Sequence, residues 1–142
     1  MPDLSIVIPV YNTEEDYLRS CFASIEACVR TGISLETIVV DDGSDPSYGA
    51  RLSDILAEYD IRASLHRKVN GGQNSARALG AELATGEYLF FVDSDDRLVP
   101  SELARVVEAA LTCVLRFFAS ITTLWRLMAH CYHIAVSGGA GA

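Results

Sequence analysis

The feature that most constrains the fold is a fourfold alternation of strand-like runs with segments of helical spacing. The strand-like runs cover residues 4–10, 35–45, 61–67 and 87–93, and the helical segments cover residues 13–32, 48–60, 69–86 and 100–112. Strands that alternate with helices in this way form a parallel sheet with right-handed crossovers and helices on both faces. The sequence therefore predicts an α/β domain.

Local detail refines this expectation. The run at 61–67 is shorter and more polar than the others, so it is predicted to lie nearer an edge of the sheet. Thr13 is the predicted N-terminal cap of the first helix. Cys21 and Cys28 share one face of that helix, roughly 10 Å apart, which exceeds the reach of a disulfide. We therefore expect both in the core of a reduced, cytosolic protein.

Charge is unevenly distributed along the chain. The formal net charge is −8, which argues against nucleic acid or an anionic membrane surface as the main partner. All 19 acidic residues lie between Asp3 and Glu108. This break divides the chain into a predicted domain at residues 1–112, an apolar segment at 113–136 that is predicted to be helical, and a disordered tail at 137–142.

The segment at 113–136 is a poor membrane span because Arg116, Arg126, His130 and His133 interrupt it. Contact with a membrane interface stays open. The sudden loss of acids fits a shifted reading frame or an aberrant truncation, which the encoding DNA read in all three frames would test. The alternative is a genuine amphipathic helix that covers an exposed face of the sheet. An exposed sheet edge and an apolar face would separately favour homodimerisation or aggregation through residues 113–136.

Carboxylates gather where two of the predicted strands end. Asp41 and Asp42 end the second strand, and Asp93, Asp95 and Asp96 end the fourth. Because parallel strands end at the same edge, these acids are expected to converge there. Asp93 and Asp95 would lie on one side of an extended strand end, a set of oxygen ligands that suits Mg²⁺ or Mn²⁺. The alternative is a solvated turn that begins a helix.

Other side chains at this edge also allow two interpretations each. Asp42 is part of an ordinary Asp-Gly-Ser turn or accepts a hydrogen bond from a base. Tyr11, taken alone, is more often a core aromatic residue than a platform for a base. Arg77 lies on the surface, pairs with the strand-end acids or reaches a phosphate. His130 and His133 lack further ligands nearby, which disfavours a metal role.

Three motifs in order resemble a known family. "SIVIPVYN", "IVVDDGSD" and "NGGQNSARALGAELATGEYLFFVDSDD" look like the nucleotide-sugar-binding half of the family 2 glycosyltransferases, over about residues 3–112. The resemblance implies a GT-A fold, which is a Rossmann-like, mostly parallel sheet flanked by helices and here truncated. It also implies inverting transfer of a hexose-type sugar from a nucleotide diphosphate, expected to be UDP, to a glycan or lipid-linked acceptor of polysaccharide biosynthesis.

The resemblance assigns a role to each matching residue. Pro9 and Tyr11 would line the nucleoside pocket, Asp42 would bind the base, and Arg77 would border the nucleotide.

In the same resemblance, Asp93 and Asp95 form the D-x-D motif. Asp93 would lie nearer the ribose or the metal, and Asp95 would be the main ligand of Mg²⁺ or Mn²⁺.

The chain departs from the family in its second half. That half is implied to carry the acceptor site and the catalytic base, and no acid follows Glu108 here, so no catalytic residue is identified. We expect weak or absent transferase activity, in the cytoplasm or at the inner face of the membrane. Two alternatives remain. One is a donor-binding module that needs a partner chain. The other is a phospho-receiver domain, which needs a lysine at a later strand end; the only lysine, Lys68, precedes the third helix, which disfavours this class.

Overall fold

The computed structural model describes residues 1–116, with side chains described to residue 110. The expectations for residues 117–142, including dimerisation, interfacial contact and the disordered tail, lie outside the described residues. The eight elements follow the predicted order: β1 (Leu4–Val10), α1 (Glu15–Val29), β2 (Leu35–Asp41), α2 (Pro46–Leu56), β3 (Ala63–Arg67), α3 (Gln73–Leu83), β4 (Tyr88–Phe91) and α4 (Pro100–Arg116).

The four strands form one parallel sheet in the order β3-β2-β1-β4. The predicted parallel sheet is confirmed, and so is the edge position of β3. The apolar β1 and β2 are buried along their whole length because each lies between two neighbours and under helices. Since all strands run the same way, their carboxyl ends meet at one edge of the sheet.

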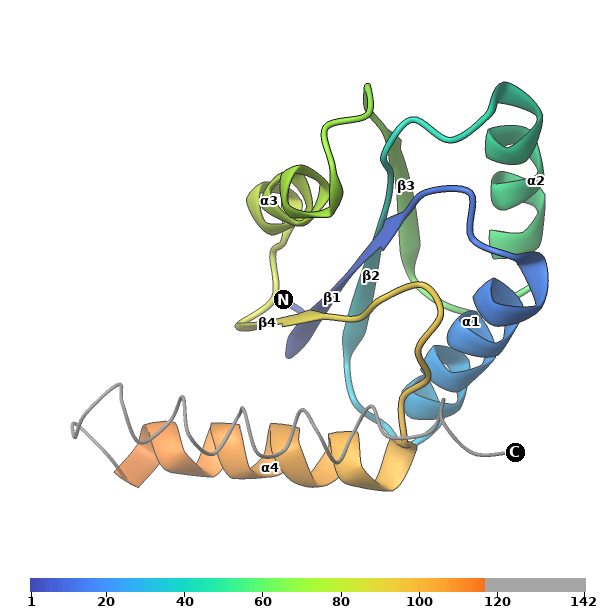
Figure 1. The fold of residues 1–142 in the computed structure, drawn as a ribbon. Helices are drawn as coiled ribbons and strands as arrows, with labels where there is room; N and C mark the ends of the chain where they lie inside the picture. Colours follow the sequence, from blue (N-terminus) through green and yellow to red (C-terminus); the bar gives the residue numbers. More distant parts are fainter. Residues whose placement is uncertain (117–142) are drawn as a thin grey trace.

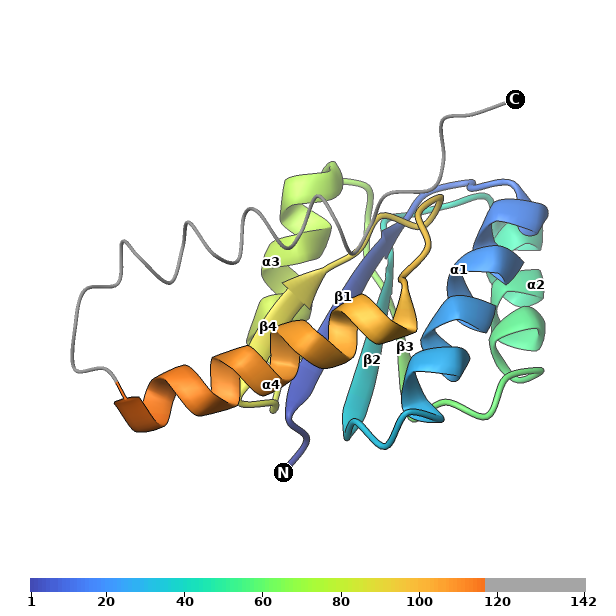
Figure 2. The ribbon, with the colours of Figure 1, turned by 90° about the horizontal axis from the view of Figure 1, so that it is seen from below.

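Helices cover both faces of the sheet, as Figures 1 and 2 show. Successive side chains of β1 point to opposite faces. Ile6 and Ile8 join the larger core with residues of α1, α2 and α4, whereas Val7 joins Ala76 of α3 in a smaller core. Cys21 and Cys28 are both buried as free thiols, which confirms their predicted place in the core.

The helix ends differ from the prediction in detail. Thr13 does not cap α1, because the helix begins at Glu15 after Glu14 without a side-chain cap. The Thr13 hydroxyl instead bonds the hydroxyl of Ser94. α4 runs on to Arg116, so the predicted domain end at residue 112 falls inside a helix. No helix within residues 1–116 is long and apolar enough to cross a membrane.

Gly80 lets α3 approach the sheet closely. A Cβ at this position would lie 2.2 Å from Cγ1 of the buried Val7. We expect Gly80→Ala to lower the free energy of unfolding by about 2 kcal/mol, because overpacking outweighs the better helix propensity of alanine. Urea unfolding measures this. Combining Gly80→Ala with Val7→Ala should remove most of the overpacking, and a Gly80→Ala variant more stable than the unmodified chain would contradict the prediction.

Candidate functional site

The loops that follow the four strands gather at the carboxyl edge of the sheet (Figure 1). They cover residues 11–14 after β1, 42–45 after β2, 68–72 after β3 and 92–99 after β4. In parallel sheets ligands bind at this edge, because loops from several strands meet there. The structure thus brings the sequence-predicted residues to one region, and their individual partners show what each can do.

The Asp42 carboxylate is buried and held by three groups of the β3–α3 loop. Its Oδ1 accepts hydrogen bonds from Lys68 Nζ at 2.6 Å and from the Gly71 backbone N–H at 3.0 Å. Burial acts to raise the pKa of Asp42, but Lys68 and the N–H groups of Gly71 and Gly72 outweigh it and hold the pKa below its usual value. Asp42 is therefore an ionised acceptor at neutral pH.

Lys68 is a site residue that the sequence argument missed. In the sequence, Lys68 had significance only for the phospho-receiver alternative. In the structure, Lys68 directly follows β3 and pairs with Asp42. Its position at a strand end was the available signal. Asp41 has a separate, structural role, because its carboxylate accepts from the Ser44 N–H at 2.8 Å and pairs with Arg67 at 3.5 Å.

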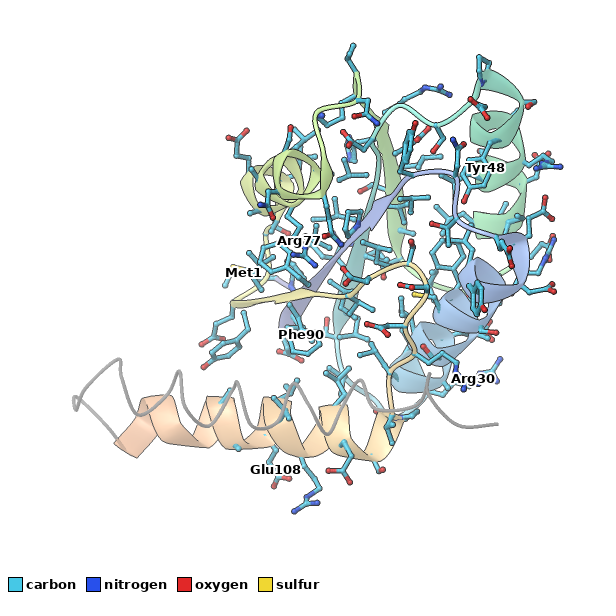
Figure 3. All side chains as sticks on the ribbon, viewed as in Figure 1. Met1, Arg30, Tyr48, Arg77, Phe90 and Glu108 are labelled. Atoms are coloured by element: carbon cyan, nitrogen blue, oxygen red, sulfur yellow. The ribbon has the colours of Figure 1, made fainter. Side chains whose placement is uncertain are left out.

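Asp93 is held from the side of α3 by two donors. Arg77 Nη2 and Gln73 Nε2 donate to the same oxygen, Oδ1, at 2.6 and 2.8 Å. The Arg77 guanidinium also lies 5.9 Å from the centre of the Phe91 ring. Figure 3 shows Arg77 pointing from α3 toward β4. The pairing of Arg77 with a strand-end acid, one of its open interpretations, is confirmed, whereas Gln73 was missed.

Asp95 and Asp96 complete the acidic turn. Asp95 is exposed and makes no ion pair or hydrogen bond with any residue in the described part of the chain. Burial raises the pKa of Asp96, and the neighbouring Asp95 and Asp93 raise it further. Burial raises the pKa of the Cys21 thiol to about 12, with a further contribution from the three acids of the turn, so Cys21 stays protonated. Arg77 pairs with Asp93, so the negative charge of this turn is only partly compensated.

This turn fits a hard divalent cation that also has other ligands. Within residues 1–116 no three His, Cys, Asp or Glu side chains form a group that could enclose a metal ion by themselves. Asp93 Oδ2 and the Asp95 carboxylate remain as oxygen donors, since both bonds to Asp93 use Oδ1. Mg²⁺ commonly binds in this way, through one or two carboxylates with substrate phosphates completing its ligands.

Tyr11 lies on the surface, so its interpretation as a core aromatic is wrong. The side chain is 56% exposed, directly after the last residue of β1. The buried position is taken by Val10, and Asn12 turns the chain away with a φ of 47°. A half-exposed aromatic ring at the carboxyl edge is accessible to a stacking partner.

Pro9 is buried within β1, opposite Val40 of β2. The Val7 carbonyl accepts from the Val92 N–H, just past the last pair between β1 and β4. The nitrogen of Pro9, two residues after Val7, also points toward the side of β4, but β4 has ended there and forms no further ladder bonds. A proline is tolerated there because no strand partner needs its missing N–H. Its place in a nucleoside pocket stays a prediction.

Comparison with protein families gives one match that covers most of the chain. The model of Glycosyl transferase family 2 matches residues 5–116. A similar curated protein is the uncharacterized glycosyltransferase YibD of Escherichia coli, 35% identical over 108 residues, which are 76% of this chain and 30% of that protein.

A second curated relative is the undecaprenyl-phosphate 4-deoxy-4-formamido-L-arabinose transferase of Pectobacterium atrosepticum. It is 35% identical over 111 residues, 76% of this chain and 33% of that protein. The chain therefore spans about a third of the length of these relatives.

Solved structures show the same fold. The mannosyltransferase PcManGT from Pyrobaculum calidifontis, solved with GDP-Man and Mn²⁺, has a TM-score of 0.62 at 25% identity, over 75% of this chain and 32% of that one. TarS of S. aureus, residues 1–349, has a TM-score of 0.60 at 23% identity, over 75% and 32% of the two chains. The predicted GT-A-type α/β fold is confirmed.

Proposed function

Since the chain belongs to Glycosyl transferase family 2, we propose that its carboxyl sheet edge binds a nucleoside diphosphate sugar as the donor of a glycosyl transfer. The observation that carries this proposal is that two carboxylates in different surroundings lie at the same edge of the sheet. Asp42 is buried, ionised and hydrogen-bonded, whereas Asp95 is exposed and without a partner among the described residues. The first suits recognition of a neutral N–H group, and the second suits a cation.

The nucleoside would lie between the ends of β1 and β2. Asp42 would accept a hydrogen bond from an N–H on the edge of the base, and a uracil imide has such a group. Tyr11 would stack on the base, with Pro9 forming the floor of the pocket. Arg77 would border the nucleotide while it holds Asp93.

Asp93 and Asp95 would hold Mg²⁺ or Mn²⁺ together with the diphosphate. A divalent cation there neutralises the charge that develops on the departing nucleoside diphosphate. The structure of PcManGT, which has the same fold, is a complex with GDP-Man and Mn²⁺, and this supports the assignment. Gln73 and Arg77 would keep Asp93 in place by bonding the oxygen that faces α3.

Transfer itself would need groups beyond the matched region. An inverting transfer requires a base that takes the proton of the acceptor hydroxyl, and no acidic residue follows Glu108 in this chain. We therefore propose donor binding for the matched region, residues 5–116, and assign no acceptor site within it. A hexose-type donor and a glycan or lipid-linked acceptor are proposed, in the cytoplasm or at the inner face of the membrane. A donor-binding module without activity alone is the second candidate, whereas family membership removes the phospho-receiver alternative.

Calorimetric titration of UDP, and then of GDP, with and without Mn²⁺, tests this function. We expect Mn²⁺ to tighten nucleotide binding, and Asp95→Ala to remove that gain. Asp95→Ala should weaken metal affinity at least roughly 10-fold, because even the loss of a residue that only supports a metal ligand has an effect of that size. Asp54→Ala, which removes an exposed carboxylate on α2, is the matched control and should bind normally. Failure of the folded chain to bind either nucleotide would overturn the proposal.

A further inference from the structure

The residue between the two D-x-D carboxylates faces the opposite way from them. Ser94 is only 8% exposed, whereas Asp95 is exposed and the Asp93 side chain is about one-third exposed. The Asp96 N–H bonds the Asp93 carbonyl at 3.0 Å and closes a tight turn around Ser94. The inward direction of Ser94 therefore constrains the backbone from which both neighbouring carboxylates project.

Ser94 is tied to a different strand end. Its hydroxyl lies 2.6 Å from the hydroxyl of Thr13, which is 81 residues away in sequence and follows β1. One hydroxyl donates and the other accepts, so each is satisfied by the other. This single bond joins the acidic turn to the loop that carries Tyr11.

The Thr13 end of this bond is itself anchored to β2. The Asn12 N–H donates to Ser44 Oγ at 3.0 Å, and the Asn12 side-chain oxygen accepts from the Asp45 N–H at 3.0 Å. Asn12 adopts a φ of 47°, which asparagine tolerates better than most residues. The ends of β1, β2 and β4 are thus joined in series through two adjacent residues, Asn12 and Thr13.

We infer that Thr13 and Ser94 are positioning residues whose mutual hydrogen bond aims Asp93 and Asp95 at a shared divalent cation. The inference rests on the proposed function. Carboxylates within four residues repel one another, so a turn without an inward tether relaxes toward greater separation. The tether holds the turn in the geometry for binding before any cation arrives, which lowers the ordering cost of binding.

Two substitutions that remove one hydroxyl each, Thr13→Val and Ser94→Ala, test the inference in the full chain. We expect each to weaken the affinity for Mn²⁺ in the presence of UDP about 10-fold, the value of one hydrogen bond, as measured by electron paramagnetic resonance of the free ion. Because both variants lose the same bond, the double variant should lose no more than either one. The affinity for UDP in the presence of EDTA should stay unchanged.

A second measurement does not depend on the metal. Hydrogen exchange of the Asp96 N–H reports on the closed turn, and it should become about 10-fold faster in both variants. Thr31→Val is the matched control, since the Thr31 hydroxyl makes a 2.7 Å bond to the Cys28 carbonyl at the far end of α1. That control should change neither readout.

The outcomes separate the two claims. Unchanged Asp96 exchange, or Mn²⁺ affinity that survives both substitutions, overturns the positioning role while the proposed function stands. Absence of Mn²⁺ binding in the unmodified, folded chain with UDP present overturns the proposed metal site and the positioning role with it. Additive losses in the double variant show that the two hydroxyls act separately, which also overturns the inference.

Discussion

Asp42→Asn is expected to lower the free energy of unfolding by about 3 kcal/mol, because it leaves the Lys68 ammonium without its anion in a largely buried place. The Asp42 side chain is 4% exposed and that of Lys68 is 19% exposed. The substitution should also weaken UDP binding by roughly 10-fold or more, the value of a hydrogen bond to a charged acceptor. Urea unfolding and calorimetry measure the two effects.

A second variant separates stability from recognition. Combining Asp42→Asn with Lys68→Met removes both charges, and replacing a whole buried pair is commonly close to neutral, so stability should return to within about 1 kcal/mol of the unmodified chain. UDP binding should stay weak, because the acceptor for the base is still changed. If binding returns together with stability, Asp42 only anchors the loop and does not recognise the base.

Asp45→Asn is the matched control for this pair of variants. Asp45 lies in the same loop, is exposed, and makes no side-chain cap to α2. It should leave stability and binding within about 0.5 kcal/mol of the unmodified chain.

Glu36→Ala is expected to lower the free energy of unfolding by about 3 kcal/mol, because it leaves the buried Ser5 hydroxyl and three part-buried donors without an acceptor. Glu36 is buried near the amino end of β2, away from the carboxyl edge of the sheet, and its carboxylate accepts four hydrogen bonds. Two come from the Ser5 hydroxyl at 2.5 Å and the Gly86 N–H at 3.1 Å, and two from the Thr85 N–H at 2.6 Å and hydroxyl at 2.8 Å.

These bonds hold the turn between α3 and β4 against β1 and β2, the two central strands of the sheet. The turn also packs closely on β1, since a Cβ at Gly86 would lie 2.6 Å from Ser5 Oγ. Glu36→Gln keeps an oxygen acceptor in place and should cost only about 1 kcal/mol. Glu87→Ala, an exposed carboxylate next to Gly86, is the matched control and should have little effect.

The Glu36 carboxylate also predicts how stability depends on pH. Burial acts to raise its pKa, but the hydrogen bonds from Ser5, Thr85 and Gly86 prevail and hold the pKa below the ordinary value of 4.5. A lowered pKa stabilises the folded chain above pH 4.5, and this contribution is lost as the pH falls through the lowered value. Glu36→Gln should therefore lose less stability than the unmodified chain as the pH falls below 4.5. Equal losses would show that Glu36 does not contribute.

Much of the fold could be predicted because the signals were local. The β-branched run of β1 and the helical spacing around Cys21 and Cys28 each report burial within a few residues. The polar character of β3 marked it as an edge strand. The converging acids Asp42, Asp93 and Asp95 could be placed at one edge, because parallel strands share their carboxyl ends.

The errors share one physical origin. Thr13 has the chemistry of a helix cap, but a competing partner, Ser94, lies 81 residues away and takes its hydroxyl. Tyr11 has the chemistry of a core residue, but the left-handed turn at Asn12 places it on the surface. In both cases the side chain was suited to two states, and distant residues decided between them.

The sequence by itself determined the class of fold, the parallel direction of the strands and the edge at which the acids meet, since these follow from periodicity and connectivity. Only the tertiary structure decided the partner of each polar group. Lys68 became the partner of Asp42, Gln73 and Arg77 both bonded one oxygen of Asp93, and Glu36 joined three segments. A hydrogen bond depends on angstrom-scale placement of elements far apart in the chain, and no local pattern carries that information.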